Sequence, residues 1–182
     1  PHGSAPSIYT LARKGLNYLR EQGLDVPSRY HPSEHREHSY LFLSHTLAVN
    51  DVLISAELFC QHEPRFELAA TIHERELKRS PARVEDESGA SITVIPDAWL
   101  DLRIDGEFRA CLVLELDRGT EEQKAWRRKV RGLVAYANGP YQEAFGTRSL
   151  TIAVVTTSGV RRLIDLLRWT ERELVELKQQ QQ

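Results

Sequence analysis

The chain has 182 residues, of which 27% are charged and 41% hydrophobic, a composition typical of a globular protein with one sizeable core. Its formal net charge of −2 excludes a general attraction to nucleic acid or anionic lipid, so contacts with DNA must come from local basic patches. No run of about 18 apolar residues predicts a membrane span, and the two cysteines, in apolar segments, favour reduced thiols in a cytoplasmic protein.

The first forty residues lead us to expect a piece of a longer protein. Residues 1–4, Pro1-His2-Gly3-Ser4, are expected to be an expression scar, and the absence of methionine suggests a fragment. Residues 12–22 predict a helix that ends at Gly23, because glycine accepts the backbone conformation at a helix end. A polar linker is expected over residues 25–38.

The next segments predict a long helix and a first strand. Residues 40–61 have apolar side chains at helical spacing, and residues 66–72 are expected to form a strand. A charged stretch and a loop over residues 81–90 follow. Glu76, in the charged stretch, is a candidate fourth carboxylate, although a solvated run of charges is the simpler interpretation.

Three strands are predicted over residues 91–95, 99–104 and 108–116. Asp105 and Gly106 indicate a hairpin turn between the last two. Residues 108–116 are apolar on both alternating faces, which is typical of a strand buried on both sides.

The remainder of the chain predicts a helix, a strand and a helix. Thr120 is expected to cap a helix that ends at Gly139, and residues 150–157 and 160–178 are expected to form a buried strand and an amphipathic helix. The order of elements predicts an α/β fold with a mixed central sheet flanked by helices, in which crossover connections make the inner strands parallel. An outlying Trp169 makes the last helix a candidate homodimer contact.

Three carboxylates are expected to meet in this fold. Asp97 ends a short apolar run, and Glu115 and Asp117 project together from one face at the end of the buried strand. Buried carboxylates are costly unless a cation or donors neutralise them, and hard divalent cations prefer oxygen ligands. Asp97, Glu115 and Asp117 are therefore candidate ligands for magnesium, or for manganese as its substitute. The alternative is a cluster of salt bridges and helix caps that involves Arg118.

The order of Pro96-Asp97, a hairpin, a Glu-x-charged tripeptide at 115–117, a helix and a strand resembles the PD-(D/E)xK restriction-endonuclease-like core. In that superfamily Asp and Glu hold magnesium, and a Lys two residues after the Glu positions the attacking water. More specifically, the sequence resembles the replication-relaxation family of plasmids and other mobile elements. This second resemblance is found in Pro96-Asp97-Ala98, in Leu114 to Thr120, at Lys129 and Tyr136, and in His45, Leu47, Val49, Asn50 and Asp51.

The resemblance implies a domain organisation. Residues 5–38 would be the end of an N-terminal winged-helix DNA-binding domain and a linker, and residues 39–182 an endonuclease-like α/β domain.

The chain departs from the nuclease pattern at Asp117, where a Lys is expected. A carboxylate cannot supply the positive charge that stabilises an attacked phosphate. On the following helix, Lys129 lies at the edge of the apolar stripe that includes Trp126 and Val130, whereas Lys124 faces solvent. Lys129 is therefore the candidate substitute, the alternative being that its alkyl chain covers the core.

Two functions follow from the resemblance. The first is a DNA-associated accessory protein of plasmid replication or relaxation with weak or no catalysis, which the missing Lys and the acidic net charge favour. The alternative is an active magnesium-dependent DNA endonuclease or nickase with Asp97, Glu115, Asp117 and Lys129 as catalytic residues. DNA and other replication or relaxation proteins are the expected partners, in the cytoplasm and without a membrane.

Overall fold

The computed structural model describes residues 9, 11–24, 40–86 and 89–180, in two units of residues 1–46 and 47–182. The first unit contains α1 (Arg13–Glu21), in which Leu16 is buried, and the beginning of α2 (Tyr40–His62). Both helices were predicted from the sequence. The scar and the linker, expected over residues 1–4 and 25–38, lie outside the described residues.

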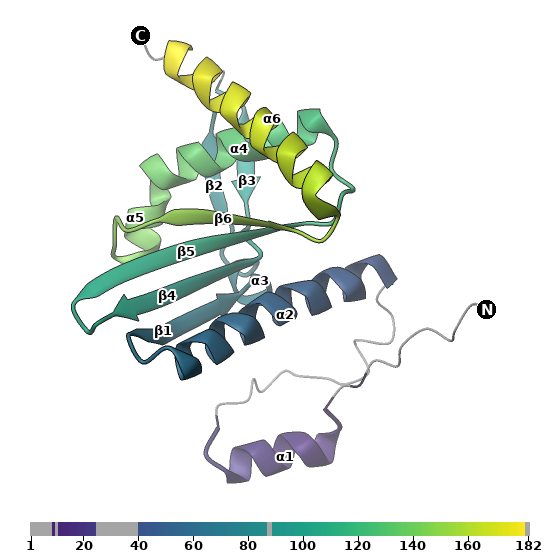
Figure 1. Ribbon diagram of the computed structural model, residues 1–182, viewed down its shortest axis with the longest axis vertical. Helices are drawn as coiled ribbons and strands as arrows, with labels where there is room; N and C mark the ends of the chain where they lie inside the picture. Colours follow the sequence, from purple (N-terminus) through teal and green to yellow (C-terminus); the bar gives the residue numbers. More distant parts are fainter. Residues whose placement is uncertain (1–8, 10, 25–39, 87–88, 181–182) are drawn as a thin grey trace. The chain divides into compact units, whose positions relative to one another are not determined.

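A four-stranded mixed sheet in the order β1-β4-β5-β6 is the centre of the second unit (Figure 1). The strands are β1 (Phe66–His73), β4 (Ala98–Ile104), β5 (Phe108–Asp117) and β6 (Thr151–Thr156). Neighbouring strands are antiparallel from β1 to β5, and only β6 runs parallel to its neighbour β5. The predicted class, a mixed sheet flanked by helices, is confirmed, whereas parallel pairing is limited to the single crossover between β5 and β6.

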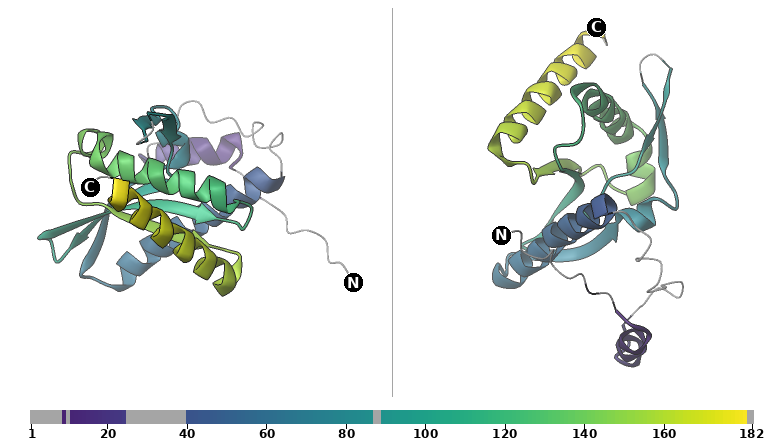
Figure 2. Two further views of the ribbon diagram at one scale, coloured as in Figure 1. Left: turned by 90° about the horizontal axis from the view of Figure 1, so that it is seen from above. Right: turned by 90° about the vertical axis from the view of Figure 1, so that its right-hand side faces the viewer.

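Helices cover both faces of this sheet (Figures 1 and 2). On one face, the part of α2 in the second unit contributes Val49, Val52, Leu53 and Ala56 to a core with Ala98, Leu100, Leu114 and Leu116. The opposite face carries α4 (Gln123–Asn138), α5 (Pro140–Phe145) and a hairpin of β2 (Ala82–Glu85) and β3 (Ser91–Val94). The helix α6 (Gly159–Gln180) packs on α4. The second half of β5 is buried on both sides, as predicted.

The hairpin β2–β3 corrects the loop predicted over residues 81–90. Ala82 and Val84 alternate with Arg83 and Glu85, and the buried Val84 joins Ile92 in the core against α4. In Figure 2 the hairpin stands beside α4. The short apolar face is therefore stabilised by packing on a distant helix.

One helix start differs from expectation. The helix α4 begins at Gln123 after Glu122, so Thr120 is not its cap. Its end at Asn138, before Gly139, is as predicted, and Pro140 starts the short helix α5, because proline at the first helical position loses no intrahelical hydrogen bond.

The apolar character of α2 exceeds what the sequence led us to expect. Within the described residues, Leu41–His62 is long and apolar enough to cross a membrane, with a mean hydropathy of 1.2. A core helix of a globular protein satisfies the same criteria. In α2, Val49 and Val52 pack on the sheet, but most of the apolar stretch is not buried, including Ile54, Leu58 and Phe59.

Trp169, expected to be outlying, packs against the α4–α6 core beside the guanidinium of Arg162, at 5.0 Å from the ring centre.

Candidate functional site

Antiparallel pairing of β4 with β5 brings Asp97 to the end of β5. The Asp97 backbone N–H donates to the carbonyl of Leu114 at 3.0 Å, and Asp97 Oδ2 accepts from the Leu116 N–H at 2.6 Å. Glu115 lies between these two partners and faces α4, with a side chain that is only 4% exposed. The structure thus places Asp97 and Glu115 close together, as the sequence led us to expect.

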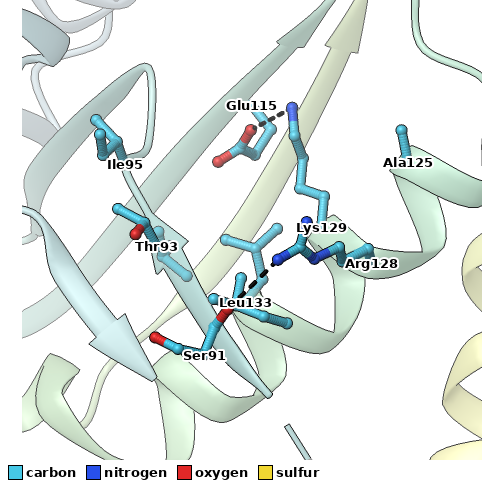
Figure 3. A pocket seen from close by; sticks show the side chains of 10 residues that line it. Ser91, Thr93, Ile95, Glu115, Ala125, Arg128, Lys129 and Leu133 are labelled. Atoms are coloured by element: carbon cyan, nitrogen blue, oxygen red, sulfur yellow. Dashed lines mark hydrogen bonds and ion pairs between the residues drawn. The ribbon is translucent and has the colours of Figure 1, made fainter. Parts of the chain in front are cut away.

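Lys129 extends from α4 to these acids. Its Nζ lies 3.2 Å from Glu115 Oε2, an ion pair drawn in Figure 3, and 2.5 Å from Glu121 Oε1. Lys124 is exposed on the other side of the helix. Helical periodicity therefore identified the inward-facing lysine from the sequence alone.

The cluster contains three carboxylates, of Asp97, Glu115 and Glu121, and the single ammonium group of Lys129. Burial, opposed by the charge of Lys129 but reinforced by Asp97, raises the pKa of Glu115 to about 7. Burial also acts against the charge of Lys129, but Glu115 and Glu121 together raise the pKa of the ammonium above its ordinary value. Lys129 is thus firmly charged, whereas Glu115 shares one lysine with a second carboxylate and faces a third.

Glu74 adds a carboxylate that the sequence did not single out. It starts α3 (Glu74–Leu77), directly after β1, and its N–H donates to the Asp97 carbonyl at 2.9 Å. One carboxylate oxygen of Glu74 lies within 4.8 Å of an oxygen of Asp97, and Lys78 pairs with Glu74 at 2.6 Å. Glu76, the residue considered from the sequence, is exposed. Because His73 pairs with Ala98, the next residue, Glu74, lies beside Asp97. Knowledge of this strand register would have identified Glu74 as a neighbour of the site.

Asp117 lies on the same face of β5 as Glu115 but is engaged by other residues. Arg162 of α6 donates from Nε to Oδ2 at 2.9 Å and from Nη2 to Oδ1 at 2.7 Å, and Thr156 and Gly119 also donate to Oδ2. Burial alone would raise the pKa of Asp117, but the hydrogen bonds from Arg162, Thr156 and Gly119 lower it. The salt-bridge alternative therefore describes Asp117, which Arg162 binds through both carboxylate oxygens.

A cleft of about 460 Å³ opens beside Glu115 and Lys129 (Figure 3). Residues 91–95 of the hairpin region form one wall and α4 forms the other. Arg128 of α4 donates to the Ser91 carbonyl at 3.3 Å. The buried acid and the lysine are thus reached from solvent through a groove with a cationic edge.

Other arginines of α4 belong to a different cluster. Arg127 forms ion pairs with Glu173 and Glu176 of α6, and Arg131 lies 3.4 Å from Glu173. Glu173 is only 1% exposed. These arginines hold α6 on α4, and the basic side chains beside the cleft are Arg128 and Lys129.

Two carboxylates lie close together around Asp97. An oxygen of Asp97 and an oxygen of Glu74 lie within 4.8 Å of each other, and carboxylate oxygens are the ligand type that magnesium and manganese prefer. Glu115 is buried and carries a raised pKa, so a cation would relieve an unfavourable concentration of negative charge.

The sequence matches the family described as Replication-relaxation over residues 1–151. No curated protein and no solved structure matches the chain. The family match covers well over half of the residues and includes Asp97, Glu115 and Lys129. The chain therefore belongs to the replication-relaxation family.

Proposed function

We propose that this chain is a magnesium-dependent DNA phosphodiesterase whose site consists of Asp97, Glu115, Lys129 and Glu74. Family membership indicates a role in the replication and relaxation of mobile DNA. The contact of Lys129 Nζ with Glu115, at 3.2 Å, supports a catalytic site most strongly, because it supplies the positive charge that Asp117 cannot supply. We therefore prefer the catalytic alternative to the accessory role that the sequence favoured.

The topology supports the same proposal. A helix, three antiparallel strands, a helix and a parallel strand occur in the chain order α2, β1, β4, β5, α4 and β6, with α3 and the β2–β3 hairpin inserted after β1 and α5 inserted after α4. This order agrees with the PD-(D/E)xK core that the sequence resembles, with the acids on adjacent strands. In our proposal Lys129 on α4 takes the role of the strand lysine.

Each residue has a distinct role in this proposal. Asp97 and Glu115 would hold the cation, with Glu74 as a third oxygen donor. When bound, magnesium would polarise the phosphate and lower the pKa of a water molecule. Lys129 would orient the phosphate and stabilise the negative charge that develops on it. Asp117 is left out of the ligand set because Arg162 occupies both of its oxygens.

We propose that DNA binds in the cleft beside Lys129, where Arg128 adds a second positive charge. Residues 5–38 would belong to a winged-helix domain that supplies most of the DNA affinity. Other replication or relaxation proteins of the same plasmid are the proposed partners, in the cytoplasm.

The accessory role stays as the second candidate because of one contact. Glu121 holds Lys129 at 2.5 Å, so two carboxylates compete with any phosphate for the same ammonium. A protein that uses this cluster only for stability would show the same arrangement.

Nicking of supercoiled plasmid separates the two functions. With magnesium or manganese, the wild type should nick, and Asp97→Ala and Lys129→Ala should each lower the rate by about 100-fold or more. Lys124→Ala, on the exposed side of the same helix, is the matched control and should nick like the wild type. Nicking that is unaffected by Asp97→Ala would refute the assigned site, and a wild type without activity would leave the accessory role.

A further inference from the structure

Three residues connect the end of β5 to the lysine of the proposed site. Asp117 binds Arg162, Arg162 binds the backbone of Glu121, and the carboxylate of Glu121 binds Lys129. We propose that this chain of contacts positions Lys129, and that Asp117, Arg162 and Glu121 are positioning residues. The catalytic meaning of this inference rests on the proposed function, but the contacts themselves do not.

The guanidinium of Arg162 is the branching point. It donates to both oxygens of Asp117, and its Nη2 also donates to the Glu121 carbonyl at 2.7 Å. The side chains of Arg162 and Asp117 are 13% and 0% exposed. A planar guanidinium can bind a carboxylate and a carbonyl at fixed angles, whereas a lysine ammonium is a point charge without this geometry.

The connection between β5 and α4 is short and depends on this anchor. Gly119 has a φ of 74°, which glycine adopts without strain, and its N–H donates to Asp117 Oδ2 at 3.0 Å. A Cβ at Gly119 would lie 2.5 Å from Ser158 Oγ. Asp117 therefore holds the turn at its start, and Arg162 holds it at Glu121.

Glu121 transmits the anchor to Lys129. Its Oε1 accepts from Lys129 Nζ at 2.5 Å, and its Oε2 is buried and has no hydrogen-bond partner among the described residues. The position of the carboxylate thus depends on Lys129 and on the anchored backbone. Because a lysine side chain loses considerable freedom when it is fixed, release of Glu121 should leave Lys129 with Glu115 as its remaining ion-pair partner and make its ammonium group more mobile.

Asp117 stands at the position where the nuclease pattern has Lys. In this protein the positive charge is on α4, as Lys129, and the strand carboxylate fixes the segment that holds Lys129. Asp117 and Lys129 would then act as one unit although they do not touch.

The test observes the Lys129 ammonium directly by ¹⁵N NMR, without metal or DNA, in the complete chain. The signal is assigned by its loss in Lys129→Arg. Asp117→Asn and Arg162→Lys should each accelerate exchange of the Lys129 ammonium protons with water by about tenfold, the effect of losing one hydrogen bond to a charged group. Arg162→Lys keeps the charge beside Asp117, so it tests the anchor if Asp117→Asn does not fold.

Asp101→Asn is the matched control. Asp101 is a carboxylate bound by an arginine, Arg109, on the same sheet, and it has no link to Lys129. The control should leave the Lys129 signal unchanged. An equal response in Asp101→Asn, no response in Arg162→Lys, or a wild-type ammonium that exchanges as fast as exposed Lys124 would overturn the proposal.

Nicking assays on the same variants separate this inference from the proposed function. A wild type that nicks, together with an unresponsive Lys129 signal, refutes only the positioning chain. A wild type without activity, together with the expected acceleration, refutes only the nuclease.

Discussion

Replacing Glu115 by glutamine should stabilise the fold above pH 7. The Glu115 side chain is 4% exposed, and burial raises its pKa from an ordinary 4.5 to about 7. Between these values the folded state binds more protons than the unfolded state. The free energy of unfolding therefore falls as the pH rises from about 4.5 to 7.

The size of the effect follows from the two pKa values. The difference between about 7 and 4.5 corresponds to roughly 3 kcal/mol, at about 1.36 kcal/mol per pKa unit. Glutamine cannot ionise, so Glu115→Gln should unfold like the wild type near pH 4 and require about 3 kcal/mol more near pH 8. The attraction of Lys129 is already contained in the pKa of Glu115, and Lys129 keeps Glu121 as its partner in the variant.

Urea unfolding followed by circular dichroism at pH 4, 6 and 8, with EDTA present, measures this difference. Glu122→Gln, an exposed neighbour of α4, is the control and should follow the wild type at every pH. A constant difference between Glu115→Gln and the wild type, or a less stable variant at pH 8, would refute the reasoning.

Three further substitutions test the surroundings of the site. Gly132→Ala places a Cβ 2.8 Å from Ile92 Cγ2, so overpacking of about 1–3 kcal/mol should outweigh a gain in helix propensity of about 1 kcal/mol and lower the Tm. Glu173→Ala removes the buried partner of Arg127, which keeps Glu176, and should cost about 1–3 kcal/mol in urea unfolding. Arg128→Ala should change stability by less than about 0.5 kcal/mol but weaken DNA binding and reduce its salt dependence, as measured by fluorescence anisotropy.

The central sheet was predictable because its signals are local. Residues 108–116 show their burial on both faces in the sequence, and the turn at Asp105 and Gly106 has the positive φ values of 54° and 70° that these residues accept. In the hairpin, β3 was predicted as the strand over residues 91–95, but β2 was not, because its apolar face consists only of Ala82 and Val84, which pack into the core against α4.

In the candidate site, too, the features with local sequence signals could be predicted and the features that depend on distant contacts could not. The proximity of Asp97 and Glu115 could be predicted because the hairpin makes β4 and β5 adjacent antiparallel strands. The inward direction of Lys129 could be predicted from the helical period of α4. The partner of Asp117 follows Asp117 by 45 residues and reaches it through the β5–β6 pairing and the start of α6. No local pattern around Asp117 indicates Arg162, so the sequence alone favoured a third metal ligand.

The excess of acid over base leads to a last prediction, on proton release. Glu115 has to lose its proton before its oxygens can bind a cation, and with a pKa of about 7 it is about half protonated at neutral pH. Manganese binding at pH 7 should therefore release about half a proton, falling toward zero near pH 8.5. Calorimetry in two buffers with different ionisation enthalpies measures this number, and Glu115→Gln serves as the control without release. Binding of manganese without proton release at pH 7 would show that Glu115 is not a ligand, because a carboxylate that stays protonated cannot hold the ion.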